Sequence, residues 1–342
     1  TPAWLAAMPT LVPKRHLGRA GGMTQMIEGI SFVLGPVIAG ALLALSGLGL
    51  VLIVDLATFG VAIGGLAIVR FPRVVSERSE DSPSLIEEVR LGWRFLRDRS
   101  GLMWLLWMYA GVNFVLAFTH VLIIPMVLTI AGESAAGTVL SIGGLGLVVG
   151  SLVMSIWGGP QQRVASITFG IMASGIALSI AGLRPNVIVV AAGFVLLLTI
   201  VPLVNTASQV LWQTKVPLDM QGRVFSLRRT VAQLASPLAM VAAGPLADRV
   251  FEPMLAPGGS LAGSVGGVIG TGPGRGIAFL VILSGLGASL IGLLGWLHPR
   301  VRHLESELPD VVPDEPPAGA EVVVAPGDGA AESDPVPAAP IG

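Results

Sequence analysis

The sequence is poor in charged residues and contains no cysteine. Of its 342 residues, 12% are charged and 53% are hydrophobic, whereas about a quarter of the residues of a soluble domain are charged. A soluble protein of this length needs more charged side chains on its surface than this sequence supplies. We therefore expect lipid to surround the chain. The absence of cysteine excludes disulfides, thiolate metal sites and a cysteine nucleophile. The net charge of -1 argues against a nucleic-acid partner.

The sequence also lacks the motifs that hold nucleotides, metals and cofactors. It has no Gly-x4-Gly-Lys-Ser/Thr phosphate loop, which argues against ATP hydrolysis by this chain. Its four histidines do not have the spacing of metal ligands. No paired acids and no nucleophile with a nearby base have the spacing that an enzyme requires. We therefore expect no cofactor, no metal site and no enzymatic activity.

Long apolar runs are abundant. A bilayer core about 30 Å thick is crossed by roughly 20 apolar residues in a helix. Eight runs reach that length, at about 22–46, 49–69, 101–130, 136–158, 164–183, 187–213, 224–247 and 275–297. The sequence thus predicts an all-α integral membrane protein with about eight transmembrane helices in this chain.

The positive charges fall on one side of these predicted helices. Of the twenty Lys and Arg residues, all but Arg184, Arg249 and Arg275 lie in alternate connections. Because cytoplasmic connections carry the excess of Lys and Arg, we predict that this side and the C-terminus are cytoplasmic. The abundance of Arg, Ala, Gly and Val suggests a bacterial source, which makes the expected location the bacterial cell (inner) membrane, with multiple passes.

A short segment occurs twice, 204 residues apart. The copies read "VPKRHLGRA" (12–20) and "VPLDMQGRV" (216–224), so that Pro13, Gly18 and Arg19 correspond to Pro217, Gly222 and Arg223. Six predicted helices separate the copies, and an even number restores the same orientation. We therefore predict a parallel repeat of six-helix units. Four helices precede the second copy within its unit and none precedes the first, so the first unit is expected to lack its first four helices.

This repeat divides the chain into four regions. Residues 1–70 are expected to hold the end of the first six-helix half, its helices 4 (end), 5 and 6. Residues 71–100 are expected to form a cytoplasmic linker with an amphipathic helix in "SLIEEVRLGWRFLRD", lying on the membrane surface or binding a partner. Residues 101–300 are expected to form the second half, helices 7–12. From residue 301 to 342 the acidic, proline-rich sequence predicts a disordered cytoplasmic tail.

Two six-helix halves joined by such a linker resemble the major facilitator superfamily over roughly residues 1–300. The stretches "GPVIAG", "IVDLATF", "DMQGRVFSLRR" and "GPLADRVFEP" are more closely similar to its macrolide-efflux and siderophore-exporter branch of drug–proton antiporters. The resemblance implies a fold of two six-helix bundles that rock about a central cavity. Its antiporter pattern falls on Gly22, Ser31, Gly35, Pro36, Ala39 and Gly40. Such small residues permit close helix packing, either at a moving seam or in ordinary helix contacts.

Three ionisable residues within the predicted spans are candidates for proton coupling. Glu28 shares a helix face with Ser31 and Gly35, so it should face the bundle. It carries a proton or forms a salt bridge with a cytoplasmic Arg. Asp55 is a second candidate, with a hydrogen-bonded structural role as the alternative. His120 is the third candidate, because a histidine side chain can take part in a proton relay, and a satisfied structural group is the alternative.

Four further residues are candidates for the wall of a substrate cavity. Asn113 lies on the same predicted face as His120, whereas Asn205, Gln209 and Trp212 follow one another at spacings of four and three. Amides beside an aromatic ring suit an amphipathic organic molecule, and hydrogen bonding between helices is the alternative. Arg228 and Arg229, one turn inside the next helix, are expected to extend to the membrane surface.

Together these features predict a secondary active transporter that exports a small amphipathic molecule in exchange for protons. Its expected partners are the small-molecule substrate, protons and the lipid bilayer, with neither nucleic acid nor ATP. The alternative is a membrane scaffold, or a truncated remnant of such a transporter, that does not transport.

Overall fold

The computed structural model describes residues 12–68 and 85–311, and these residues form helices and no strand. The long helices are α2 (Leu17–Ile68), α3 (Leu85–Arg97), α4 (Ser100–Ala131), α5 (Glu133–Trp157), α6 (Arg163–Leu183), α7 (Val187–Lys215), α8 (Leu218–Leu246) and α11 (Arg275–Leu297). The short ones are the 3-10 turn η1 (Lys14–His16), the π-helical η2 (Ala247–Phe251), α9 (Glu252–Leu255), α10 (Val265–Ile269), α12 (Pro299–Arg302) and α13 (Leu304–Glu307). The prediction of an all-α membrane protein is confirmed.

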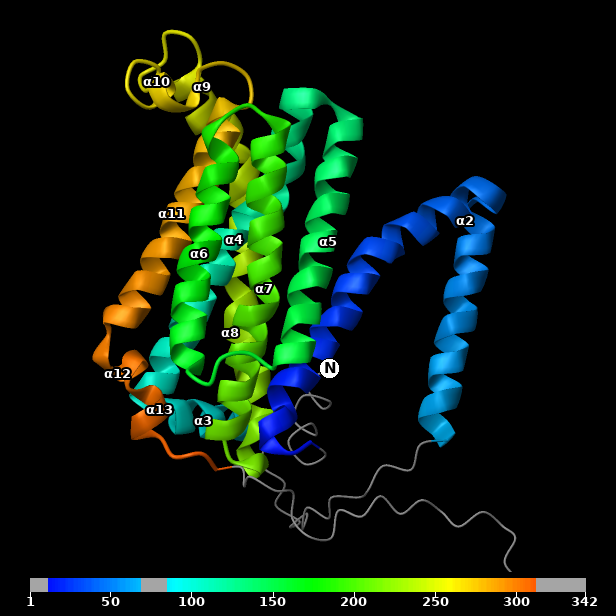
Figure 1. Ribbon diagram of the computed structural model, residues 1–342, viewed down its shortest axis with the longest axis vertical. Helices are drawn as coiled ribbons and strands as arrows, with labels where there is room; N and C mark the ends of the chain where they lie inside the picture. Colours follow the sequence, from blue (N-terminus) through cyan, green and yellow to red (C-terminus); the bar gives the residue numbers. More distant parts are fainter. Residues whose placement is uncertain (1–11, 69–84, 312–342) are drawn as a thin grey trace, which may run out of the picture.

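Helices α4, α5, α6, α7, α8 and α11 form one bundle, which we name the second-half bundle (Figure 1). Each is long and apolar enough to cross a membrane, as the sequence predicts. Within the bundle α6 packs between α7 and α11, and α4 packs against α8 and α11. Small residues permit the closest of these contacts, because a Cβ atom on Gly175 of α6 would overlap the backbone of Gly285 on α11.

Helix α2 differs from the prediction of two separate spans at 22–46 and 49–69. Its helical backbone continues from Leu17 to Ile68. A straight helix of that length would measure about 78 Å, far more than the bilayer core, and Figure 1 shows that α2 instead bends sharply into two arms. Flanked by Ser46 and Gly49, the two residues between the predicted spans are Gly47 and Leu48. Neither residue removes a backbone donor as proline does, so the helix turns without ending.

The first arm of α2 packs against α5 through glycines. A Cβ atom on Gly18 would overlap the carbonyl oxygen of Gly158, and one on Gly22 would lie 2.5 Å from the backbone nitrogen of Ser155. Further along, one on Gly29 would approach Leu147 to 3.3 Å. Beyond this contact α2 diverges from α5 (Figure 1). The first arm therefore touches the second-half bundle at the end near Lys14 and separates from it toward the other end.

The two copies of the repeated segment have the same local structure. Pro13 precedes η1 with φ -55° and ψ 142°, and Pro217 precedes α8 with φ -55° and ψ 145°. In each copy the proline carbonyl accepts a hydrogen bond from the third residue on, His16 N at 2.8 Å and Met220 N at 2.9 Å. Their surroundings differ: Gly18 is buried against Gly158, whereas no described residue lies within 4 Å of a Cβ atom built on Gly222.

The amphipathic helix of the linker is present as α3. Its buried side holds Leu96 in the core, and its other side exposes Ile86 (73%) and Val89 (56%). Glu88 lies 3.7 Å from Arg223, the arginine of the second repeat copy. The first part of the linker, 71–84, and residues 69 and 70 before it lie outside the described residues.

The start of the expected disordered tail is helical instead. Residues 301–311 include the end of α12 and all of α13, with Leu304 buried in the core. The carboxylate of Glu305 accepts hydrogen bonds from the backbone nitrogens of Arg163 (2.9 Å) and Val164 (3.1 Å) at the start of α6. These unpaired helix donors and the positive end of the helix dipole hold this acidic segment in place. Residues 312–342 lie outside the described residues.

The difference between the two repeat glycines gives a paired test. Gly18→Ala forces the backbones of α2 and α5 apart, so we expect the free energy of unfolding to fall by about 1–3 kcal/mol. Gly222→Ala meets no described neighbour and favours helix, so stability should stay the same or rise slightly. Thermal unfolding of the 342-residue chain in detergent, followed by tryptophan fluorescence, measures both. Equal loss in the two variants would contradict the packing described.

Candidate functional site

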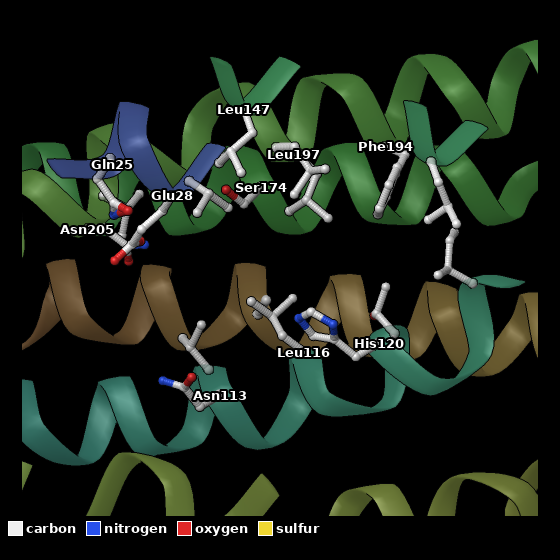
Figure 2. Close-up of a pocket in the computed structure, with 18 of the residues that line it drawn as sticks. Gln25, Glu28, Asn113, Leu116, His120, Leu147, Ser174, Phe194, Leu197 and Asn205 are labelled. Carbon is white, nitrogen blue, oxygen red and sulfur yellow. The ribbon is translucent and has the colours of Figure 1, made fainter. Parts of the chain in front are cut away.

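A cavity of about 890 Å³ lies between α2 and the second-half bundle. Side chains from α2, α4, α5, α6, α7 and α11 line it, and most of them are apolar. Figure 2 shows Leu116, Leu147, Leu197 and Phe194 around its length. Its volume falls within the range of about 300–1,000 Å³ that is typical of sites for drug-sized molecules.

One end of this cavity is polar. Gln25 and Glu28 from α2 and Asn205 from α7 lie next to one another there (Figure 2). Glu28 and Asn205 are exposed to the cavity. Among the described residues that line the cavity, Glu28 is the single carboxylate. The prediction that Glu28 faces inward, away from lipid, agrees with this position.

The polar residues of α4 lie further along the same cavity. His120 is exposed to it beyond Leu116, away from Glu28 (Figure 2). The side-chain nitrogen of Asn113 donates a hydrogen bond to the backbone oxygen of Tyr109 on its own helix, at 2.8 Å. The cavity thus brings together Glu28, His120, Asn113 and Asn205 from the predicted set. The described residues hold no group of three or more His, Asp and Glu side chains that would bind a metal ion.

A smaller hollow of about 180 Å³ adjoins the polar end. It shares Gln25, Glu28 and Asn205 with the large cavity and adds Gln209 and Arg228. Glu28 and Arg228 are the charged members of its described lining, one from α2 and one from α8. The described residues show no ion pair for either of them. A carboxylate and a guanidinium therefore lie around one small hollow without a direct salt bridge.

Arg228 is held by α4 and α7. Its guanidinium donates hydrogen bonds to Ser208 Oγ at 2.9 Å and to Gln209 Oε1 at 3.4 Å. It also lies 5.3 Å from the ring centres of both Tyr109 and Trp212, within the range of cation–π contacts. These contacts fix a positive charge beside the polar end of the cavity.

The position of Arg228 corrects the expectation that it extends to the membrane surface. Successive residues of an α-helix point about 100° apart, so two adjacent arginines do not share one direction. Arg228 points into the bundle, whereas Arg229 is exposed. Hydropathy and charge alone do not reveal which of the two turns inward.

The predicted cavity residues of α7 do not all reach the large cavity. Asn205 lines it, and Gln209 lines only the small hollow. Trp212 lines neither hollow and its side chain is fully buried. Its ring packs in the hydrophobic core and lies beside the guanidinium of Arg228, so it supports the arginine rather than the cavity wall.

Asp55 lies apart from the other ionisable residues. It is exposed on the second arm of α2 and lines neither hollow. Its backbone oxygen accepts a hydrogen bond from Thr58 Oγ1 at 2.8 Å. The Thr58 hydroxyl therefore binds the backbone of Asp55 rather than its carboxylate.

The antiporter pattern is divided between two environments. Gly22 packs on α5, and Ser31 lines the cavity. No described residue lies within 4 Å of a Cβ atom built on Gly35. Residues 36–40 continue the helix, and the side chains of Pro36 and Ala39, together with the surroundings of Gly40, lie outside what the structure describes.

Comparison with known families agrees with this arrangement of helices. A model of the Major Facilitator Superfamily matches residues 1–240. The chain belongs to this superfamily. It is similar to macrolide efflux protein A of Streptococcus pyogenes, with 30% identity over 263 residues, 73% of this chain and 63% of that protein.

Other relatives are similar to the chain over comparable lengths. Macrolide efflux protein A of Enterococcus faecalis is 29% identical over 249 residues, 70% of this chain and 76% of that protein. The multidrug efflux pump Tap of Mycolicibacterium fortuitum is 27% identical over 268 residues, 72% of this chain and 62% of that protein. The chain therefore matches less than two thirds of the Streptococcus pyogenes protein.

The structure adds residues to the site that sequence reasoning missed. Gln25 lies one helical turn from Glu28, a spacing that was available as a signal. Tyr109 and Ser208 are distant from each other and from Arg228 in sequence. The sequence does not indicate that these residues meet, because only the packing of α4, α7 and α8 brings them together.

The support of Arg228 gives a second paired test. Ser208→Ala removes an acceptor and leaves a buried donor of Arg228 without its partner, so the free energy of unfolding should fall by about 1–3 kcal/mol. Ser141→Ala, at an exposed position on the cavity-facing side of α5, makes the same change of atoms and should cost less than about 0.5 kcal/mol. Denaturant or thermal unfolding in detergent compares them. A smaller loss in the Ser208 variant would contradict the role given to this contact.

Proposed function

We propose that the protein is a secondary active transporter that exports small amphipathic molecules, of the drug, macrolide or siderophore-like kind, in exchange for protons. The observation that carries this proposal is the cavity between α2 and the second-half bundle, apolar along its length and bearing Glu28 at its polar end. The relatives named as efflux proteins support the same direction of transport.

The chemistry of the cavity favours an amphipathic substrate. Apolar side chains from six helices supply burial for a hydrophobic body, and the cluster of Gln25, Glu28 and Asn205 offers hydrogen bonds and one negative charge. A few polar groups in a mostly apolar cavity fix the orientation of a ligand. A purely polar solute would leave most of this surface without a suitable partner.

The contact between α2 and α5 supports alternating access. The two helices touch through Gly18 and Gly22 at one end and diverge toward the other. A cavity closed at one end by such a contact opens there when the contact separates, and superfamily members with this architecture alternate by rigid movement of one half against the other.

Glu28 is the preferred proton carrier, with His120 as a second group in the same cavity. An ionisable residue among apolar helices costs about 2.5–3.5 kcal/mol on insertion scales and is retained for a reason. We propose that Glu28 exchanges its proton when the substrate binds or leaves. Asp55 is the weaker candidate, because it lines neither hollow.

The proposed setting is the bacterial inner membrane, with the end near Lys14 and the C-terminus in the cytoplasm. Exposed leucine and isoleucine side chains on the outer faces of the helices suit contact with lipid. In this setting the proton gradient supplies the driving force, so the proposal includes neither ATP, nor nucleic acid, nor an enzymatic reaction.

Export measurements with variants of two acidic residues test the proposal. The full-length protein is expressed in efflux-deficient bacteria, and the accumulation of macrolides and other amphipathic compounds is measured with and without an uncoupler. Glu28→Gln keeps the size and hydrogen bonding of the side chain but cannot exchange a proton, so export should fall about tenfold or more. Asp55→Asn, the matched control, should keep most of the activity.

The outcomes separate the alternatives. Export that ignores the uncoupler would remove proton coupling, and a large loss in Asp55→Asn alone would move the carrier to the second arm of α2. Absence of export for every compound, with normal protein levels, would favour the non-transporting scaffold or remnant.

A further inference from the structure

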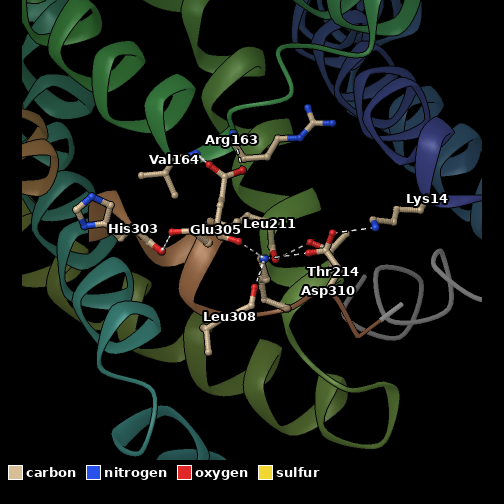
Figure 3. Close-up of polar contacts among 11 residues, drawn as sticks. Lys14, Arg163, Val164, Leu211, Thr214, His303, Glu305, Leu308 and Asp310 are labelled. Atoms are coloured by element: carbon tan, nitrogen blue, oxygen red, sulfur yellow. Dashed lines mark hydrogen bonds and ion pairs between the residues drawn. The ribbon is translucent and has the colours of Figure 1, made fainter. Parts of the chain in front are cut away.

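The segment Leu304–Val311, which we name the C-terminal strap, crosses the end of the second-half bundle near Lys14. Figure 3 shows it passing from α6 to α7 and on toward Lys14. Its first fixed point is Glu305, whose two carboxylate oxygens accept the backbone hydrogen bonds at the start of α6, 2.9 and 3.1 Å long. This contact ties the strap to the second-half bundle.

The second fixed point is Lys215, the last residue of α7. Its side chain is only 5% exposed. Its ammonium group donates to the backbone oxygens of Glu305, at 3.0 Å, and Leu308, and lies 3.0 Å from the carboxylate of Asp310. Three strap oxygens therefore surround one buried cation, and such a charge is costly to leave without partners.

The backbone of the strap is also bound to α7. The nitrogen of Val311 donates to the oxygen of Thr214 at 2.8 Å. Together with Glu305 and Lys215, this bond attaches the strap to the second half along its whole length.

The last contact of the strap reaches the other half of the fold. The second carboxylate oxygen of Asp310 lies 2.8 Å from the ammonium group of Lys14, in the η1 turn that leads into α2. Asp310 thus lies between two lysines, one from each half (Figure 3). Just beyond Lys14, Leu17 is fully buried against Val210 of α7. The ion pair and this apolar contact join the halves where α2 and α5 are closest.

We propose that the C-terminal strap is a latch: it stays bound to α6 and α7, and the contact between Asp310 and Lys14 forms when the cavity is closed at this end and breaks when it opens. The proposal rests on the proposed transport function, because it describes what regulates access to the same cavity. It assigns a role to Asp310 and Lys14 that is distinct from proton exchange at Glu28.

The two lysines differ in the way that a reversible latch requires. Lys215 is buried and held by three oxygens, whereas the Lys14 side chain is 27% exposed and that of Asp310 is 33% exposed. Exposed ion pairs are weak and re-form easily, whereas buried ones do not part readily. The contact that parts when the halves separate is therefore the one with Lys14.

The charge on Asp310 does not change over the physiological pH range. Burial raises the pKa of Asp310, but hydrogen bonds from Lys14 and Lys215 and their positive charges outweigh burial and hold the pKa below its ordinary value. The carboxylate therefore stays ionised at neutral pH, and separation of the two halves, not protonation of Asp310, breaks the contact.

Reversible cross-linking of the full-length protein tests the latch. The 342 residues contain no cysteine, so Lys14→Cys and Asp310→Cys introduce a defined pair that a short bis-methanethiosulfonate reagent joins. The cross-link should lower export about tenfold or more, and a reductant should restore it. The matched pair Thr214→Cys and Val311→Cys joins the strap to α7 only, and its cross-link should leave export nearly unchanged. Full export with the halves joined at positions 14 and 310 would overturn the proposal.

Distance measurements separate this test from the transport assay. Spin labels on the same two pairs are compared by electron paramagnetic resonance, with and without substrate and at different pH values. We expect two distance populations for positions 14 and 310 and one for positions 214 and 311. A single unchanged distance for both pairs would overturn the latch even if the protein exports drugs. Two populations in a protein without export would support the latch and reject the proposed transport.

Discussion

The position of α2 against the second-half bundle depends on a contact made by glycines, which have no side chains to hold the two backbones apart. Gly18 and Gly22 of α2 let its backbone lie directly on the backbone of α5 at Gly158 and Ser155. In lipid, apolar side chains gain little by leaving one apolar surrounding for another, so close backbone packing has to hold helices together. This contact fixes α2 against the second-half bundle at one end. The divergence of the two helices beyond it leaves room for the cavity.

The second constraint is the cost of placing charged side chains in apolar surroundings. Glu28 and Arg228 lie around one small hollow, and the arginine is held by Ser208, Gln209 and two aromatic rings. The arginine therefore places a fixed positive charge beside the end of the cavity that holds Glu28. A proton or a cationic group that binds at Glu28 is therefore repelled by the positive charge of the neighbouring arginine. The electrostatic energy at the polar end of the cavity therefore depends on the charge of what binds there.

Much of the fold was predictable, because the length and hydropathy of an apolar run indicate directly whether it can span a membrane. The six spans of the second half follow the predicted ranges. The continuation of α2 through the predicted break was not predictable, because Gly47 and Leu48 keep their backbone donors and do not have to end a helix. At the site, Glu28 and Asn205 were found from their positions on helices, whereas the inward direction of Arg228 depends on tertiary packing. The strap was missed because composition predicts disorder, whereas Glu305 binds the start of α6, 142 residues earlier in the chain.

The central claim is that a water-accessible cavity between α2 and the second-half bundle binds the exported molecule. Single cysteines on one helix test it most directly, with Ser141→Cys exposed to the cavity and Val149→Cys, 52% exposed, on the outer face of α5. A charged methanethiosulfonate reagent should label position 141, and an exported compound should protect it, while position 149 stays unlabelled in lipid. Labelling of position 149 with no reaction at 141, or labelling at 141 that no exported compound reduces, would contradict the account.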